Sequence, residues 1–450
     1  MKNKLLIISL FLVGILIRIY CAFKQPLWLD EIYSLYFAHN FSPLNLIIQL
    51  PEAHPGAYYL FLKVLLCFST NLIFLRTISS ILPFLIGCYL LYRQKQSKIL
   101  LFALLLNPLF IHLSWQLRMY GLTFMFSVIL INLFLASSPF NHKKLLSIAL
   151  LSTLFSFSLI IPVFCLYIYL SLREKKITSF LPFLFIPSEF LIIKGFSTYI
   201  GYAEYASWIN SPTLTNIPTV IFTSLGFGTD VQNIGSATIM ISFFFFLFFI
   251  PFIYYFSKKN RLFFYSYTLP LIVTILISVI FPFLSQHFFF YHFIPKISLF
   301  LPRFLLPMSL YFYIFVFQEI KPKLQIPLLI ILFILWLIPN SKLNFHPFYI
   351  NANPINYPKN SLIMPPWENL RLHSSFSNSD LNTIAQNFNI ASSIESTLTN
   401  SSSNPDCTSL KQFKNIYYLV DSTITSLNNY HLKIQNLLKL CHHQVTLVLL

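Results

Sequence analysis

The sequence predicts an all-α membrane protein with about eleven transmembrane helices and a small C-terminal α/β domain. Of its 450 residues, 56% are hydrophobic and only 10% are charged, whereas an average soluble domain is roughly 25% charged. The mean hydropathy is +0.70, with 51 Phe and 25 Tyr, which is more apolar surface than soluble domains bury. The charges are confined to short clusters between apolar runs. This composition excludes a soluble enzyme, a nucleic-acid-binding module and a disordered protein.

The apolar runs predict the transmembrane helices, because a helix of about 20 apolar residues crosses the hydrocarbon core of a bilayer. In chain order, the expected spans cover residues 5–23, 74–92, 99–113, 121–137, 145–159, 160–172, 178–197, 236–256, 262–284, 304–318 and 324–339. The apolar stretch Ala57–Phe68 is left over, and at about 1.5 Å per residue it is too short to cross. We expect it to form an interfacial or re-entrant helix in the first outer loop, residues 24–73.

The basic residues predict the orientation of these spans. With the N-terminus in the cytoplasm, the cytoplasmic loops hold fifteen basic residues and two acidic ones, Glu174 and Glu319. The basic residues are Lys2, Lys4, Arg93, Lys95, Lys98, Lys143, Lys144, Arg173, Lys175, Lys176, Lys258, Lys259, Arg261, Lys321 and Lys323. The positive-inside rule therefore predicts a multi-pass protein of the cell membrane, with its C-terminal domain outside the cytoplasm. We attribute the net charge of +17 to topology and expect no nucleic-acid partner.

The transmembrane domain is expected to cover residues 1–340, and residues 341–450 form the extracytoplasmic domain. In that domain, Asn415–Ser422 and Gln444–Leu450 have the pattern of buried strands, and Ile424–Cys441 that of an amphipathic helix. Cys407 and Cys441 lie in it, either as a disulfide or as free thiols. The other cysteines lie in apolar segments and are interpreted as packing residues. No zinc-type ligand spacing occurs, and we expect neither a metal nor another cofactor.

The first outer loop carries candidate functional carboxylates. Asp30 and Glu31 are adjacent, and on a helix neighbouring side chains point about 100° apart, so only one of them can line a given cleft. Glu52 and His54 follow, directly before the short helix Ala57–Phe68. Ionisable residues are rare in a protein this apolar, which makes each one a candidate for function. The alternatives are solvated loop acids for the carboxylates, and helix capping or a headgroup contact for His54.

Basic and aromatic residues of later outer loops are candidate phosphate ligands. Arg118 can bind a phosphate through two parallel hydrogen bonds, with the Tyr120 hydroxyl as a further donor, or it can extend to lipid headgroups. The loop Ser285–Arg303 adds His292 and Lys296 among aromatic residues. This loop is interpreted either as a lid over a lipid substrate or as a plain interfacial aromatic belt.

Taken together and in this order, these segments resemble the multi-spanning GT-C glycosyltransferases that use polyprenyl-phosphate sugars, which include protein O-mannosyltransferases and aminoarabinose transferases. The segments are WLDEIYSLYFA at Trp28–Ala38, EAHPGAYY at Glu52–Tyr59, LR at Leu75–Arg76, SWQLRMYGL at Ser114–Leu122 and PRFLLPM at Pro302–Met308. The resemblance covers residues 5–140 by motif and the rest by span pattern. Two positions depart from the family: Gly56 replaces a proline, and Gln116 replaces an acid, which argues against a metal-dependent mechanism.

The resemblance implies transfer of a sugar from a polyprenyl-phosphate donor to a lipid, protein or envelope-glycan acceptor, with inversion, at the outer face of the membrane. Asp30 is then the expected general base, with Glu31 second and Glu52 the third catalytic carboxylate. The expected substrate-binding residues are His54, Tyr58, Tyr59, Arg118, Tyr120, His292, Lys296 and Arg303. The expected partners are the donor, the acceptor and membrane lipids.

Two other functions compete with this one. A transporter or flippase for a lipid-linked glycan needs no covalent chemistry, but transporters place charges near the bilayer midplane in interrupted helices. The acids here collect at the outer ends of the spans, and no internal repeat is evident. A structural scaffold that presents the C-terminal domain gives no reason for Asp30, Glu52 and Arg118 to occur together.

Overall fold

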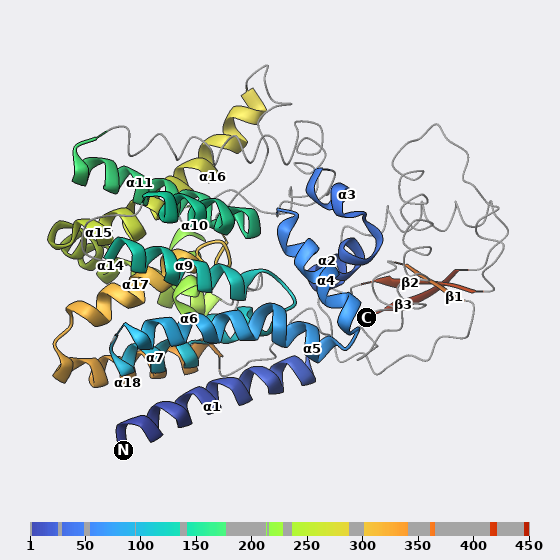
Figure 1. The fold of residues 1–450 in the computed structure, drawn as a ribbon, viewed down its shortest axis with the longest axis horizontal. Coiled ribbons are helices and arrows are strands. Elements are labelled where there is room, and N and C mark those ends of the chain that lie inside the picture. The colour runs from blue at the N-terminus through green and yellow to red at the C-terminus, as the bar shows by residue number, and fades with distance from the viewer. Residues whose placement is uncertain are drawn as a thin grey trace.

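A computed structural model describes residues 2–25, 29–48, 55–94, 96–135, 142–176, 213, 216–227, 236–287 and 301–340, together with 361–364, 415–420 and 445–449. Most of its helices lie side by side in a bundle (Figure 1). The helices α2, α3 and α4, which follow the first helix in sequence, group together at one end of this bundle (Figure 1).

The helices are α1 (Lys2–Lys24), α2 (Leu29–Asn40), α3 (Pro43–Ile48), α4 (Ala57–Phe68), α5 (Leu72–Arg76), α6 (Leu82–Arg93), α7 (Lys98–Leu106), α8 (Pro108–Trp115), α9 (Tyr120–Leu135), α10 (His142–Phe155), α11 (Ile160–Glu174), α13 (Asn216–Phe222), α14 (Ser236–Lys259), α15 (Arg261–Phe263), α16 (Leu269–His287), α17 (Leu306–Glu319) and α18 (Pro322–Asn340). Shorter helical turns adjoin them. These are the π-helical turns η1 (Thr77–Ile81), η5 (Thr223–Phe227) and η6 (Phe264–Thr268), and the 3-10 turn η2 (Phe157–Leu159).

Among the residues that the structure describes, fewer spans are found than the eleven predicted. In the described part of the chain, four helical stretches are long and apolar enough to cross a membrane: Leu72–Arg93, Phe157–Glu174, Ile239–Lys259 and Arg261–Ile280. Helices α7 and α8 make a fifth if this pair, bent by 63°, counts as one span. The predicted span 5–23 lies within the 23-residue α1. Some other predicted spans are helical but short; the 16 residues of α9 extend only about 24 Å, against a hydrocarbon core of about 30 Å. The predicted span 178–197 lies outside the described residues.

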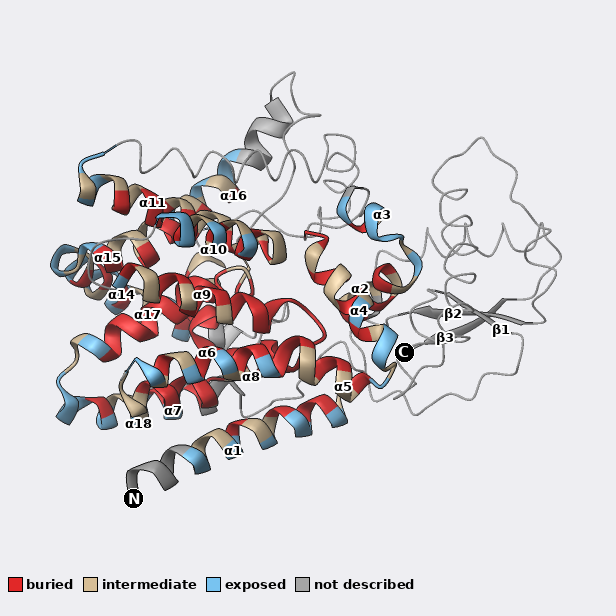
Figure 2. Cartoon of the chain, viewed as in Figure 1, coloured by how far each residue is buried: buried red, intermediate tan, exposed pale blue. Residues whose placement is uncertain are grey.

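The surface of the bundle is apolar, as a membrane protein requires. Figure 2 shows buried residues concentrated on α9 and α17, with exposed residues on the outward faces of α1, α14 and α18. Large apolar side chains are among those exposed, including Leu16, Phe248 and Ile330. Soluble monomers rarely expose apolar surface on this scale. Several of the helices are therefore suited to contact with lipid.

Basic loops gather at the end of the bundle away from α2–α4. Lys259, the last residue of α14, pairs with Glu319 at the end of α17 at 2.5 Å. Gln318 donates a hydrogen bond to Gln96, in the α6–α7 connection, at 3.0 Å. The start of α1 and the α17–α18 connection lie at the same end, at the left of Figure 1. The positive-inside rule requires the basic loops to lie at one end of the bundle, as these do. The orientation of the bundle in the membrane stays a prediction.

The bend between α7 and α8 is stabilised by polar side chains. Asn107 accepts hydrogen bonds from the backbone N–H groups of Leu109 and Phe110, which open α8. Its amide nitrogen donates to the Leu225 carbonyl at 3.0 Å. The buried Arg18 of α1 donates to the Leu105 carbonyl at 3.0 Å, a group freed by the break. These bonds replace the backbone pairs that a broken helix loses.

The C-terminal region contains a three-stranded parallel sheet. Its strands are β1 (Ser361–Met364), β2 (Asn415–Val420) and β3 (Val445–Leu449), in the order β1-β2-β3. Tyr417 of β2 lies opposite Thr446 of β3. Strands β2 and β3 fall within the two predicted strand segments, whereas β1 was not predicted. The predicted helix Ile424–Cys441, Cys407 and Cys441 lie outside the described residues, so the complete α/β domain stays a prediction.

Candidate active site

The first turn of α2 carries Asp30 and Glu31, whose side chains have different surroundings. The helix begins at Leu29, and acidic residues are favourable in a first turn because they face the positive end of the helix dipole. Glu31 is fully buried, whereas the Asp30 side chain is 25% exposed. As expected for adjacent helical residues, only one of the two carboxylates faces an accessible space.

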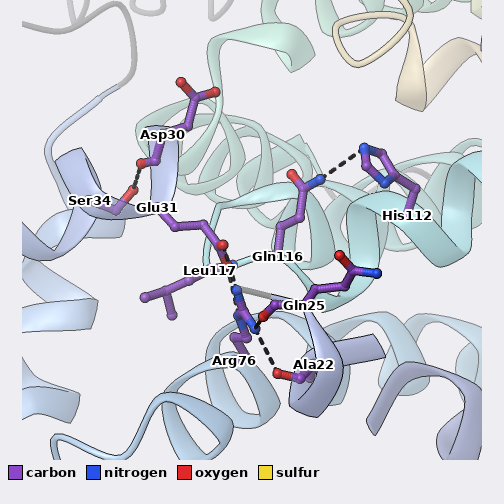
Figure 3. A network of polar contacts seen from close by, with 9 residues as sticks. All are labelled: Ala22, Gln25, Asp30, Glu31, Ser34, Arg76, His112, Gln116 and Leu117. Carbon is purple, nitrogen blue, oxygen red and sulfur yellow. Dashed lines mark hydrogen bonds and ion pairs between the residues drawn. The ribbon is translucent and has the colours of Figure 1, made fainter. Parts of the chain in front are cut away.

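Glu31 forms a buried ion pair with Arg76 of α5. The Arg76 Nε donates to Glu31 Oε1 at 2.9 Å, and Nη2 donates to Oε2 at 2.6 Å (Figure 3). The backbone N–H of Leu117 also donates to Oε1, at 2.6 Å. Neither charged side chain is exposed to solvent. Both carboxylate oxygens of Glu31 are therefore occupied by internal donors, and the catalytic role predicted for Glu31 stays a prediction.

Arg76 connects Glu31 to the end of α1 and to α8. Its Nη1 donates to the carbonyls of Ala22 and Gln25, at 2.6 and 2.7 Å. Its guanidinium also lies 4.8 Å from the centre of the Trp115 ring, in a cation–π contact. The sequence marked Arg76 only as part of the family-like segments, with no role. Its position shows that it holds together the segments that carry the candidate site.

Asp30 lies between two arginines that are distant in sequence. Arg303 Nη1 donates to Asp30 Oδ2 at 3.0 Å, and Arg118 Nη2 lies 4.0 Å from the same oxygen. Both arginine side chains are almost fully buried. The structure therefore brings together three of the predicted site residues, and it leaves the carboxylate partly accessible.

Arg118 is held in place by further hydrogen bonds. Its Nη1 donates to the Asp30 backbone carbonyl at 3.1 Å, to Ser34 Oγ at 3.1 Å and to the Tyr59 hydroxyl at 3.3 Å. Tyr59, predicted as a substrate ligand, thus contacts Arg118. Tyr58 beside it is fully buried, and its ring packs edge-on against that of Tyr59.

The segment that carries Arg118 packs tightly against η1. The Arg118 N–H donates to the Gln116 carbonyl at 2.7 Å, which closes a tight turn, and Ser80 Oγ donates to the Arg118 carbonyl at 3.1 Å. A Cβ at Gly121 would lie only 2.0 Å from the Ser80 carbonyl oxygen, so this approach requires glycine. Tyr120, also a predicted ligand, is nearly fully buried at the start of α9.

The buried pair His112 and Gln116 adjoins this turn and was not predicted as part of the site. The Gln116 amide nitrogen lies 3.0 Å from His112 Nε2 (Figure 3). The sequence signal that could have identified this pair was a histidine within an apolar predicted span, because ionisable residues are rare in such spans. Glu52, His54, His292 and Lys296 lie outside the described residues, and their roles stay predictions. In the ranges that the structure describes, no three His, Cys, Asp or Glu residues group as a metal site.

No family model, no curated protein and no solved structure matches this chain. The resemblance to GT-C glycosyltransferases therefore stays a prediction that rests on the sequence segments.

Proposed function

We propose that this protein transfers a sugar from a polyprenyl-phosphate donor to a hydroxyl acceptor, at the membrane face where α2–α4 lie. The proposal is carried by one observation: the partly exposed Asp30 carboxylate lies beside the guanidinium groups of Arg118 and Arg303. This combination supplies a proton acceptor next to cations that suit a phosphate. The apolar helices around it suit a substrate with a long lipid chain.

The two arginines would hold the donor phosphate. Guanidinium groups bind phosphate oxygens through planar, paired hydrogen bonds. In the present arrangement these groups are engaged by Asp30. A phosphate entering beside them competes with the Asp30 carboxylate for the same N–H donors. Donor binding thereby releases the carboxylate to act on the acceptor.

The reaction is a direct displacement at the sugar. The acceptor oxygen attacks the anomeric carbon while Asp30 accepts the proton of its hydroxyl group. The bond between the anomeric carbon and the phosphate oxygen breaks, and polyprenyl phosphate leaves with the electron pair. Arg118 and Arg303 stabilise the negative charge that develops on this phosphate. The configuration at the sugar carbon is inverted.

Transport of a lipid-linked glycan is the second candidate function. It is favoured by the bent pair α7 and α8, because discontinuous helices form the substrate sites of many transporters. The polar groups at this bend are used internally, however: Asn107 caps α8 and bonds the Leu225 carbonyl, and Arg18 bonds the Leu105 carbonyl. This leaves the Asp30 cluster as the better candidate site.

The test is transfer activity of an Asp30→Asn variant. Asparagine keeps the size of the side chain but cannot take a proton, so turnover should fall by roughly 10²–10⁴. Glu319→Gln is the matched control, because it makes the same chemical change to an ion-paired acid at the opposite end of the bundle. Activity is followed as labelled sugar moved from polyprenyl-phosphate sugars to membrane acceptors, with products identified by mass spectrometry.

A loss of less than tenfold for Asp30→Asn would contradict its role as the base. Absence of any covalent product from the wild-type protein, together with movement of lipid-linked glycan across proteoliposomes, would favour transport instead.

A further inference from the structure

We propose that Gln116, held by His112, binds a hydroxyl group of the transferred sugar. This inference rests on the proposed function and deepens it, because it assigns a sugar-recognition residue beside the phosphate-binding arginines. It concerns the position where the sequence has an amide in place of the acid of the GT-C segment.

The first observation is an unused hydrogen-bond acceptor. The Gln116 side chain is fully buried, and its amide nitrogen lies 3.0 Å from His112 Nε2. Among the residues that the structure describes, its amide oxygen Oε1 has no hydrogen-bond partner. Buried acceptors without a partner are rare in folded proteins because burial removes their bonds to water. A ligand that donates a hydrogen bond would satisfy this oxygen.

The second observation is where this amide lies. Gln116 opens the tight turn that ends at Arg118, and the N–H of Leu117 between them binds Glu31. The Arg118 side chain in turn binds the backbone of Asp30. In Figure 3, Gln116 lies between the Glu31 and His112 side chains. The unused acceptor is therefore built into the segment that carries the phosphate-binding arginine.

The third observation concerns His112, which fixes the amide. The imidazole is nearly fully buried, and the positive charge of Arg303 acts on it electrostatically. Arg303 also pairs with Asp30. His112 of α8 therefore lies within electrostatic reach of Arg303, and Gln116 directly follows α8. By holding the amide nitrogen, His112 leaves the amide oxygen as the group offered to a ligand.

The chemistry of the position selects a neutral hydroxyl donor. Sugars present several hydroxyl groups, each of which donates one hydrogen bond. An amide oxygen accepts such a bond without adding a negative charge next to the donor phosphate. A carboxylate at position 116 would repel that phosphate. Gln116 therefore suits recognition of the sugar beside arginines that are reserved for the phosphate.

The test compares binding of lipids with and without a sugar. The probes are undecaprenyl phosphate and undecaprenyl phosphates that carry a hexose, a pentose or an aminopentose, measured with the purified full-length protein in detergent. The quantity of interest is the ratio between the Kd of the bare lipid and the Kd of the best sugar-bearing lipid. Gln116→Leu should lower this ratio about three- to tenfold, the size of one neutral hydrogen bond, and leave the Kd of the bare lipid unchanged.

Two further variants separate recognition from folding. Gln116→Glu keeps an acceptor, so it should retain the preference for sugar while weakening both classes of lipid through its charge. Gln325→Leu removes another buried glutamine, one that bonds the Phe317 carbonyl at the basic end of the bundle. It should leave the ratio unchanged, and its thermal stability provides the reference for loss of a buried amide.

An unchanged ratio in Gln116→Leu, or a wild-type protein with no preference for any sugar-bearing lipid, would overturn the sugar subsite. If the bare lipid still binds and transfer still depends on Asp30, the proposed function survives that result. If neither class of lipid binds and no transfer occurs, the proposed function fails with it.

Discussion

Replacing Glu31 by Gln tests whether the Glu31–Arg76 pair organises the site. The carboxylate accepts three internal N–H groups, at 2.9 and 2.6 Å from Arg76 and at 2.6 Å from Leu117, and neither charged side chain is exposed. Glutamine removes the charge and turns one acceptor into a donor that faces a guanidinium N–H. Removing one partner of a buried ion pair costs about 3–5 kcal/mol, because the other charge stays buried without compensation. We expect a loss of folding stability of that size.

Buried cysteines provide the assay. Cys21, Cys88 and Cys165 are buried free thiols, so a thiol-reactive fluorescent dye reports their exposure as the protein unfolds on heating. Cys67 is exposed, and Cys407 and Cys441 belong to the predicted C-terminal domain, so these three cysteines should first be replaced by Ser to lower the background. Because Cys21 lies next to the Ala22 carbonyl that Arg76 binds, it reports directly on this region.

The matched control is Glu319→Gln, which alters an ion pair of similar length whose side chains are accessible to solvent. Accessible pairs contribute little, so this variant should unfold at nearly the wild-type temperature. The reasoning is refuted if Glu31→Gln is no less stable than Glu319→Gln. A double variant that also replaces Arg76 by Gln should recover part of the loss, since no charge is then left buried.

Three other outcomes are expected. Arg118→Lys keeps a positive charge but loses the planar donors that reach Asp30, Ser34 and Tyr59. The Kd for undecaprenyl phosphate should therefore rise in this variant and rise further in Arg118→Ala. Kd values equal to that of the wild type would leave Arg118 without a role in binding. Gly121→Ala should destabilise the protein in the dye assay because its Cβ would lie 2.0 Å from a backbone oxygen, and wild-type stability would contradict that packing. A reporter fused after Lys259 should be cytoplasmic and one after Asn404 should be outside, and finding both on one side would overturn the orientation.

Helix positions were largely predictable because hydropathy and helix-ending residues act locally. The short helix expected at Ala57–Phe68 is α4, with the same bounds. The run expected at 236–256 lies within α14. The run expected at 99–113 became the bent pair α7 and α8, because Asn107 caps a new helix where one continuous span was expected. Helix length and bending depend on such contacts with neighbouring helices, which a hydropathy pattern does not contain.

By itself, the sequence determined that the chain is an apolar, helical protein, and it pointed to Asp30, Arg118 and Arg303 as candidate residues, because composition and rare charges are visible without coordinates. Only the tertiary structure decided how the charges pair. Arg76 pairs with Glu31 across 45 residues, and Arg303 pairs with Asp30 across 273. Such pairs form because helix packing brings distant segments together and excludes water around them. That packing buries the Glu31 carboxylate and leaves the side chain of its neighbour Asp30 partly exposed.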